Sequence, residues 1–381
     1  MHIQQFYICT ILGLTFSNYC VIIESQNKKK VIGIKKKVTI QDIADALGIS
    51  RNTVSKAINN TDGLADATRE RILQKAVEMG YKQFSYVNTL SGISTSDAGT
   101  SAQQPRFHGE IALFTTTLLT QSHFAILLLD KFQKELSQLG YTLNTHRVDQ
   151  DNLANMTLPI TFVKERVSAI ICVEMFNRDY DEMVCKLGLP VLFVDGPTKR
   201  SGDSLPADQL YMDNTTGITK LVNEMLLQGK KRIGFIGNYD HCQSFFERYT
   251  AFRCAMLMAG VPVDEKFCIK ENHYEEIHAA FSSYSELPDL FICANDFVAV
   301  DAIRALRNLG KSVPEDVMFC GFDDAPESRV ISPALTTVHI HTQIMAFTAT
   351  HLLMSRIEEP SLDYRTVHTE ANLIRRDSTK F

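Results

Sequence analysis

The sequence predicts an α/β core of two doubly wound parallel-sheet subdomains, preceded by an all-α helix-turn-helix headpiece. Three observations lead to this prediction. The chain has 381 residues, which is enough for two or three domains. Between Val38 and Asn60, apolar residues recur at helical spacing on both sides of Gly48. From Gly109 onward, helical stretches, glycines and short strands rich in β-branched and aromatic residues alternate, which is typical of parallel sheets covered by helices.

The first headpiece helix is expected to begin at Ile40. Thr39 and Asp42 have the spacing of a capping box, in which two side chains satisfy the free amides of a first turn. Gly48 follows the last apolar position, where a helix favours a left-handed residue. Ser50 can cap a second helix. The buried face of that helix is expected to consist of Val54, Ala57 and Ile58. Two helices across such a turn form a helix-turn-helix.

The exposed start of the second helix carries side chains that can read DNA. Arginine can bond both acceptors of a guanine edge and asparagine the edge of adenine, whereas Thr, Ser and Lys suit phosphates or a thymine methyl group. Residues 35–86 contain nine Lys and Arg against six Asp and Glu, a net charge of +3, so the rest of the chain carries −8 of the total of −5. The alternative interpretation is a small three-helix bundle whose polar face is merely solvated.

Residues 38–81 resemble the DNA-binding headpiece of the lactose/galactose-repressor family of bacterial transcription regulators. The matching motifs are VTIQDIA, the GIS turn, TVSKAIN and TRERIL followed by MGY, in the family's order. The resemblance implies binding to double-stranded operator DNA with the second helix in the major groove. It also implies a third helix over about 67–79, capped by Asp66 because Ala65 stands at the family's capping serine. The implied DNA-binding residues are Thr39, Ser50, Arg51, Asn52, Thr53, Ser55, Lys56, Asn59, Tyr81 and Leu90.

The headpiece is assigned to residues 37–83, and a hinge and linker to residues 84–107. The stretch FSYVNTLSG, residues 84–92, occupies the place of the family's hinge helix, which folds on DNA and inserts a leucine into the minor groove. Leu90 matches that leucine. Tyr86, Val87 and Asn88 replace the usual small and basic residues, so a plain linker is the alternative interpretation. We predict a hinge that is disordered without DNA.

Residues 1–36 are assigned to an extension outside the fold. A translation start further downstream would explain such an extension. The stretch 6–23 is largely apolar, but polar residues interrupt it, and no Lys or Arg precedes it as a signal peptide would require. A membrane anchor is the alternative interpretation, because three lysines follow at 28–30. We expect a cytoplasmic protein without stable membrane association.

From about Phe107 to the C-terminus, the chain resembles the family's sugar-binding-protein-like core. In that core, two α/β subdomains are joined by three crossovers, and a small effector binds in the cleft. The resemblance places the N-subdomain at about 108–208 plus 339–362 and the C-subdomain at about 209–338 plus 363–381, which together form the effector-binding core, 108–381. It further implies a homodimeric regulator, a repressor, whose DNA affinity is controlled by a small effector such as a sugar or sugar derivative.

The resemblance also implies the residues that bind the effector. Arg248 in ERYTAF, Asn295 in ANDFVAV and Asp323 in GFDD match family phrases at the cleft. Guanidinium, amide and carboxylate groups offer the planar, paired hydrogen bonds that polyhydroxylated ligands need. The other candidates follow the first core strand or lie at the start of a helix. For each of them, a purely structural role is the alternative interpretation. They are Thr115, Thr116, His123, Phe124 and Ser244.

No pattern in the sequence favours a metal, a cofactor or an enzyme. The nine cysteines form no C-x-x-C pair, and the eleven histidines form no H-E-x-x-H set. GFIGN is not a dinucleotide-binding fingerprint, and neither a nucleophile elbow nor a Walker loop is present. Two alternatives remain open. One is a solute-binding protein or sugar-modifying enzyme that retains an unused headpiece, and the other is a core that has lost its ligand and only dimerises.

Overall fold

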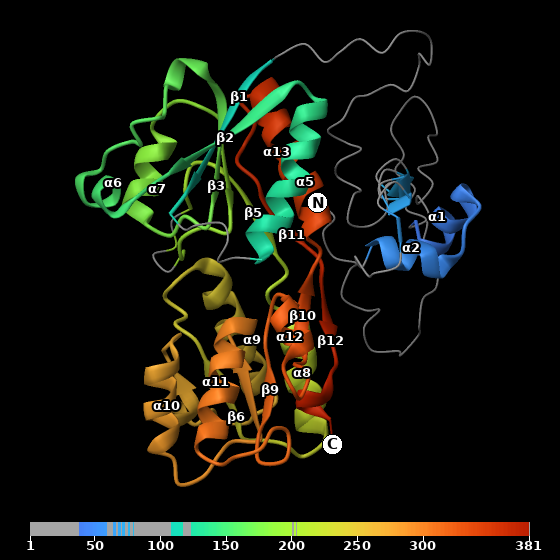
Figure 1. Ribbon diagram of the computed structural model, residues 1–381, viewed down its shortest axis with the longest axis vertical. Coiled ribbons are helices and arrows are strands. Elements are labelled where there is room, and N and C mark those ends of the chain that lie inside the picture. Colours follow the sequence, from blue (N-terminus) through green and yellow to red (C-terminus); the bar gives the residue numbers. More distant parts are fainter. Residues whose placement is uncertain are drawn as a thin grey trace, which may run out of the picture.

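The structure is a computed structural model that describes residues 38–58, 64–65, 68–69, 71–72, 75–76, 79, 108–116, 123–199, 202 and 204–380. A small helical headpiece lies beside an elongated core of two α/β lobes (Figure 1). The predicted extension 1–36, the hinge at 84–92 with Leu90, the cap Asp66, and Asn59 and Tyr81 lie outside the described residues. Within these residues, no helix is both long and apolar enough to cross a membrane.

The headpiece helices begin and end where the local signals predict. Helix α1 spans Ile40–Leu47, and Thr39 and Asp42 form the expected capping box. Gly48 adopts the left-handed conformation with φ of 65°, which reverses the chain at little steric cost. Helix α2 spans Arg51–Ile58, and the Ser50 hydroxyl accepts a hydrogen bond from the amide of Thr53 at 3.1 Å. Residues 68, 69, 71, 72, 75 and 76 of the predicted third helix are helical.

The first lobe is built on a six-stranded parallel sheet with the order β11-β5-β4-β3-β1-β2. Its strands are β1 (Gly109–Thr115), β2 (Tyr141–Arg147), β3 (Val167–Val173), β4 (Val191–Val194), β5 (Asp208–Met212) and β11 (Thr366–Thr369). Helices α5 (His123–Gln138) and α13 (Thr342–Glu358) cover one face, whereas α6 (Gln150–Asn155) and α7 (Arg178–Cys185) lie on the other side (Figure 1). Strands β3 and β4 are almost wholly buried, as strands covered on both faces should be.

The second lobe is built on a four-stranded parallel sheet with the order β7-β6-β8-β9. Its strands are β6 (Ile233–Ile236), β7 (Cys268–Ile269), β8 (Leu290–Cys293) and β9 (Met318–Cys320). The helices of this lobe are α8 (Thr216–Leu227), α9 (Gln243–Met258), α10 (Tyr274–Ser282), α11 (Asp296–Asn308) and α12 (Pro326–Val330). Separate apolar clusters fill the two sides of the sheet, one with α8 and α9 and the other with α10 and α11. The predicted pair of doubly wound subdomains is therefore present.

The chain crosses between the lobes after β5, after β10 (Thr337–Ile340) and before β12 (Ala371–Ile374), which pairs antiparallel with β10. The predicted boundaries after residues 208 and 362 are too early. Strand β5 pairs with β4 and β11 in the first sheet, so residues 209–212 and 363–369 belong to the N-subdomain. The pairing partners are more than 150 residues apart along the chain, so local patterning does not reveal them.

Two sets of contacts tie the ends of α13 to the rest of the protein. At its start, Ile344 and Phe347 are buried in the same apolar cluster as the headpiece residues Ile43 and Val54, so the headpiece packs against this helix. Near its end, Arg356 binds both carboxylate oxygens of Asp208, each at 3.0 Å. Arg365 also donates to Asp208, which is fully buried at the start of β5. Such a network fixes α13 to the edge of the first sheet.

Candidate functional site

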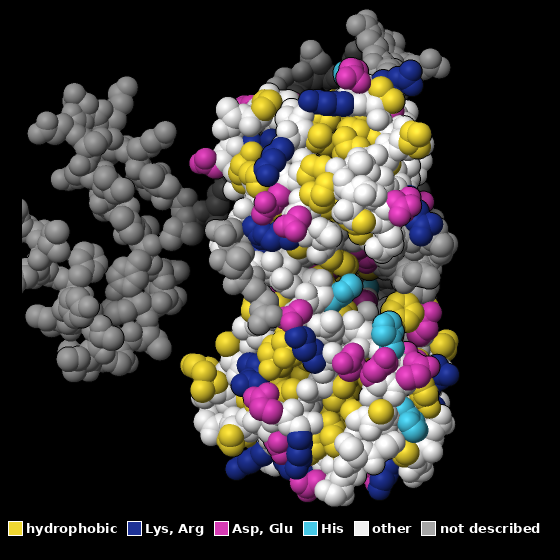
Figure 2. All heavy atoms as spheres, turned by 90° about the vertical axis from the view of Figure 1, so that its left-hand side faces the viewer, with side chains coloured by type: hydrophobic (Ala, Val, Ile, Leu, Met, Phe, Trp, Pro, Cys, Tyr) yellow, Lys and Arg dark blue, Asp and Glu magenta, His cyan; other side chains and the backbone are white. Residues whose placement is uncertain are grey.

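The candidate effector site is a pocket between the two lobes, at the carboxyl ends of strands from both sheets. Figure 2 shows the indentation between the lobes, with a histidine and acidic side chains exposed at it. The cavity measures about 230 Å³. Parallel sheets place ligands at this edge because the loops after successive strands meet there. The described lining residues are Phe124, Glu174, Phe176, Asp195, Met212, His241, Cys242, Phe245, Arg248, Asn295, Phe297, Asp323 and Ala325.

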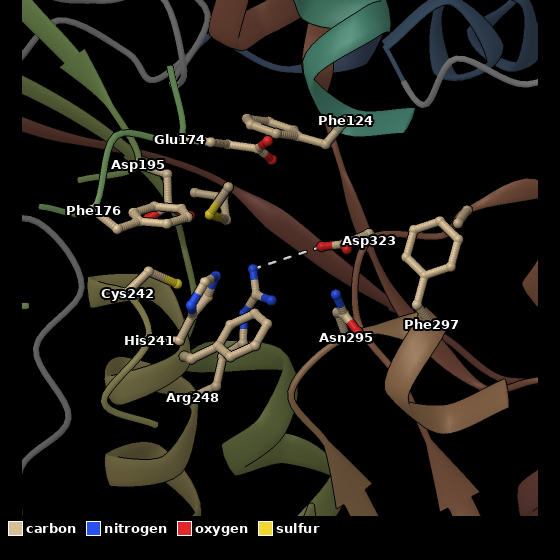
Figure 3. Close-up of a pocket in the computed structure, with 13 residues that line it drawn as sticks. Phe124, Glu174, Phe176, Asp195, His241, Cys242, Arg248, Asn295, Phe297 and Asp323 are labelled. Atoms are coloured by element: carbon tan, nitrogen blue, oxygen red, sulfur yellow. Dashed lines mark ion pairs between the residues drawn. The ribbon is translucent and has the colours of Figure 1, made fainter. Parts of the chain in front are cut away.

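Arg248 occupies the centre of the pocket (Figure 3). It projects from α9, is 2% exposed and stacks on the ring of Phe322 with its guanidinium carbon 3.6 Å from the ring centroid. Its Nε donates to the Asn214 side chain at 2.9 Å, and its Nη1 donates to the Ala294 carbonyl at 2.6 Å. Its Nη2 lies 3.6 Å from a carboxylate oxygen of Asp323. These partners hold the guanidinium in one orientation before any ligand arrives.

The two other predicted residues of the C-subdomain lie at the ends of neighbouring strands. Asn295 follows β8 and caps α11, because its side-chain Oδ1 accepts a hydrogen bond from the Val298 amide at 2.9 Å. Its NH₂ group is the part of the amide that remains to donate to a ligand. Asp323 follows β9 with φ of 111°, an unfavourable conformation for a residue with a side chain. Burial raises the pKa of Asp323 to about 7, although Arg248 opposes the increase.

The N-subdomain contributes two further carboxylates, Glu174 after β3 and Asp195 after β4. Both adopt the left-handed conformation, with φ of 53° and 52°. Asp195 is 8% exposed, and its Oδ1 accepts a hydrogen bond from the Ser244 hydroxyl at 2.7 Å. Burial raises the pKa of Asp195 to about 6, and the charge of Glu174 contributes to the increase. Glu174 also raises the pKa of Asp323, so the carboxylates of the two lobes interact across the pocket.

Aromatic side chains line the pocket on several sides. The Phe176 and His241 rings meet edge to face at 4.7 Å, and His241 also contacts Phe245 at 5.5 Å between ring centroids. Burial lowers the pKa of His241, which favours its neutral form at neutral pH. Phe124 and Phe297 border the remaining sides (Figure 3). Aromatic faces beside fixed polar groups are suited to ligands with a flat ring or an apolar sugar face.

The structure brings Phe124, Arg248, Asn295 and Asp323 together but leaves three other predicted residues outside the lining. Thr115 is buried at the end of β1. Thr116 borders a separate surface hollow next to Arg147 and donates to the Glu174 carbonyl. Ser244 is fully buried behind Asp195, which it positions. Because successive residues at a strand end or in a first helical turn point in different directions, only some of them face the cleft. The backbone of His123 lies in α5, and its side chain is outside the described residues.

Sequence reasoning missed most of the N-subdomain side of the pocket. Glu174 and Asp195 directly follow the buried strands VSAIICV and VLFV, and Phe176 lies in the loop after the first of them. The rule that ligand groups lie at strand ends would have selected them if it had been applied to every strand. Met212, His241, Phe245, Phe297 and Ala325 were not predicted as ligand-binding residues either. Most of this second group are apolar residues that sequence patterns do not distinguish from core.

The candidate DNA-binding surface lies on the second headpiece helix. Arg51, Asn52 and Lys56 are exposed, and Thr53 and Ser55 are partly exposed. Val54, Ala57 and Ile58 are buried on the opposite side, as predicted. Thr39 and Ser50 cap the two helices, and their hydroxyls are engaged with Asp42 and Thr53. The helix therefore presents its polar side chains outward on a packed support.

Comparisons with known proteins match both parts of the chain. Residues 39–83 match the family model for bacterial regulatory proteins of the lacI family, and residues 222–379 match the model for a periplasmic binding protein-like domain. The HTH-type transcriptional repressor PurR of Pasteurella multocida is 28% identical over 358 residues, which cover 90% of this chain and 98% of the relative. The chain belongs to the lacI family. The PurR repressor of Actinobacillus pleuropneumoniae is 27% identical over 356 residues, which cover 90% of this chain and 98% of the relative.

Solved structures of the lacI-family type share the fold. The complex of the transcriptional regulator CelR with cellobiose aligns with a TM-score of 0.62 at 21% identity, covering 90% of this chain and all of the other. The Lac repressor dimer bound to operator and the anti-inducer ONPF aligns with a TM-score of 0.58 at 18% identity, covering 91% and 100%. The predicted α/β core with an N-terminal helix-turn-helix is thus confirmed. A lacI-family chain combines a DNA-binding domain with an effector-binding domain and is a regulator, not an enzyme.

Proposed function

We propose that this protein is a sequence-specific transcriptional repressor that acts as a homodimer in the cytoplasm, with operator affinity set by a small carbohydrate effector in the inter-lobe pocket. The observation that carries the proposal is the combination in one chain of an exposed recognition helix and a preformed polar pocket. Arg51 and Asn52 supply the DNA-reading chemistry. Arg248, Asn295 and Asp323 supply the polar groups of the pocket.

The pocket can couple ligand binding to lobe movement because both lobes contribute polar groups to it. Glu174 and Asp195 belong to the N-subdomain, whereas Arg248, Asn295 and Asp323 belong to the C-subdomain. A ligand that contacts both sets stabilises one relative position of the lobes. The headpiece packs against α13, which runs from the crossover into the N-subdomain. Such coupling typically amounts to about 1–3 kcal/mol, or roughly a 5- to 150-fold change in affinity.

The names of similar proteins support the proposal that this protein is a repressor and that its effector is a carbohydrate. Curated relatives of this chain include PurR repressors. Among the structural neighbours, the CelR regulator is bound to cellobiose, and a lacI-family regulator from Enterococcus faecium holds ribose. The mixture of aromatic rings with carboxylate, amide and guanidinium groups in this pocket fits a polyhydroxylated ligand.

A DNA-binding measurement tests the first half of the proposal. A duplex selected from a random library by the full chain should bind with an affinity that falls by about 10³- to 10⁵-fold between 50 and 200 mM salt, as expected for six to ten phosphate contacts. Arg51→Ala should relax the selected preference at one base position. A solute-binding protein or enzyme with an unused headpiece would yield no selected duplex and no such salt dependence.

A thermal-shift screen of sugars, sugar derivatives and purines tests the second half, because a ligand that binds the folded state raises the melting temperature by mass action. A stabilising compound should lose its effect in Asp323→Ala and keep it in Glu276→Gln, which removes an exposed carboxylate from α10. If the stabilisation survives in Asp323→Ala, the ligand does not bind in this pocket. If no compound stabilises the chain, the carbohydrate half of the proposal fails, which favours an effector of another class or a core that serves only as a dimer scaffold.

A further inference from the structure

Helix α13 carries apolar side chains on two opposite sides. The apolar residues of its inner side, which are fully buried in the core beside the six-stranded sheet, are Met345, Ala346, Ala349, Leu352 and Leu353. Ile344 and Phe347 are three residues apart, so they share one side of the helix. Because each residue advances a helix by about 100°, this pair points away from the inner set. A helix that is apolar on its outer side as well needs a second partner to cover that side.

The headpiece covers the outer side of α13. Ile344 is fully buried and Phe347 is 8% exposed, and both belong to the apolar cluster of the headpiece. The headpiece members of this cluster come from α1, α2 and the third helix, and they are Ile43, Ala44, Val54, Ala57, Ile58, Ile72 and Ala76. The outer pair of α13 therefore extends the core of the headpiece, and the two parts bury apolar surface against each other.

The contact reaches the crossover between the lobes. His341 lies between β10 and α13 and is buried, and its ring interacts with the backbone of Ile58 at the end of α2. The Nε2 atom of the same ring lies 2.8 Å from Oδ1 of Asn372 in β12. One side chain thus contacts both the headpiece and the two strands next to the crossovers. A change in the relative position of the lobes would move this part of the contact.

The docked position of the headpiece is unfavourable for binding DNA. Figure 1 shows the headpiece level with the junction of the lobes, whereas β1 begins at the far end of the N-subdomain. The chain outside residues 35–86 carries −8 of the total net charge of −5. A duplex on the docked headpiece would lie along this acidic core, and its phosphates would be repelled. A headpiece that leaves α13 avoids this repulsion.

We propose that the contact between the headpiece and α13 is autoinhibitory, with Ile344 and Phe347 holding the headpiece on the core in competition with operator DNA. This inference rests on the proposed function, because it assigns a regulatory role to a contact of the same DNA-binding headpiece. A docked state that is about ten times more populated than the undocked state lowers the apparent DNA affinity by about tenfold. The contact at His341 makes this population depend on the relative position of the lobes.

Substitutions on the two sides of α13 test the competition. The full chain and its variants are titrated at one salt concentration with the duplex selected from a random library. Phe347→Ala and Ile344→Ala should each bind this duplex several-fold more tightly, up to about tenfold, because weaker docking leaves more of the headpiece free. Met345→Ala is the matched control for Ile344→Ala. It shortens a fully buried apolar side chain on the inner side of the same helix and should not raise DNA affinity.

A fluorescence measurement detects the docked state directly. The chain contains no tryptophan, so Phe347→Trp introduces a single indole at the contact. In the protein without DNA, this indole should be protected from quenching by acrylamide. A saturating amount of the selected duplex should expose it. An indole that is fully accessible without DNA, or one that stays protected at saturating DNA, would overturn the inference.

The titrations separate this inference from the proposed function. If the parent chain and both outer-side variants bind the selected duplex with equal affinity and a steep salt dependence, the contact is not autoinhibitory and the regulator stands. An equal gain in affinity in Met345→Ala would overturn the inference in the same way. If only the outer-side variants select a duplex, the inference is supported. If no chain selects a duplex, the proposed function fails and the inference fails with it.

Discussion

Replacing Asp181 by asparagine should change how the stability of the protein depends on pH. Asp181 lies in the first turn of α7, where its side chain is fully buried. Neither of its carboxylate oxygens has a hydrogen-bond partner among the described residues. Burial raises the pKa of Asp181 to about 8, and the nearby positive charge of Arg178 offsets only part of the increase. The carboxyl group is therefore protonated in the folded protein at neutral pH and ionised in the unfolded chain.

The magnitude follows from this difference in protonation. Between about pH 4, the pKa of an unperturbed aspartate, and about pH 8, folding takes up one proton at Asp181. Because the folded state binds more protons than the unfolded state, this residue lowers the free energy of unfolding by up to about 1.4 kcal/mol for each pH unit of increase. Between about pH 5 and pH 7, the loss amounts to about 3 kcal/mol. An asparagine cannot ionise, so Asp181→Asn should lack this loss.

Urea unfolding of the full chain at several pH values between about 5 and 8 measures the effect. The free energy of unfolding of Asp181→Asn relative to the parent chain should rise with pH over this range. Asp179→Asn is a matched control, because Asp179 is an exposed aspartate in the same helical turn. If the difference between Asp181→Asn and the parent chain does not vary with pH, the carboxyl group is not protonated in the folded state and the reasoning is wrong.

Three other predictions concern separate parts of the structure. Arg51→Ala should cost about 1–3 kcal/mol of operator-binding free energy and relax the preference at one base position. Lys56→Ala should instead weaken binding to all sequences alike. Selection experiments with both variants measure the difference. Asp208→Asn should destabilise the protein by about 3–5 kcal/mol in denaturant unfolding, because it leaves the buried Arg356 and the partly buried Arg365 without their carboxylate; an unchanged midpoint would contradict this. Effector affinity measured by calorimetry should rise between about pH 5 and pH 7.5, since Asp195 and Asp323 ionise with pKa values of about 6 and 7, and Asp323→Asn should flatten the rise.

The headpiece was predictable in detail because its signals are local. The Thr39–Asp42 capping box, the left-handed Gly48 and the Ser50 cap each act within a few residues, so they are readable along the chain. The alternation of helices and strands likewise predicted two parallel sheets. The crossing points were predicted less well, because the sheet to which β5 belongs depends on pairing with β11, whose residues lie far along the chain.

The candidate site was predictable in its C-subdomain half. Arg248, Asn295 and Asp323 lie in recognisable phrases, and the structure brings them into one pocket. Glu174 and Asp195 come from the other lobe, and their approach to Asp323 depends on how the two lobes meet. That approach determines which polar groups a ligand meets in the pocket.

The positions of the headpiece helices, the α/β class and the residue types that can contact DNA and ligand are predictable from the sequence alone, because capping and hydrophobic periodicity act over short distances. Which side chains face the pocket depends instead on how distant segments pack in the fold. This packing buries Ser244 behind Asp195, leaves Thr116 at a separate hollow, and encloses Asp181 without a hydrogen-bond partner among the described residues. Burial and electrostatic coupling between distant segments depend on packing in three dimensions, and the order of residues along the chain does not specify that packing locally.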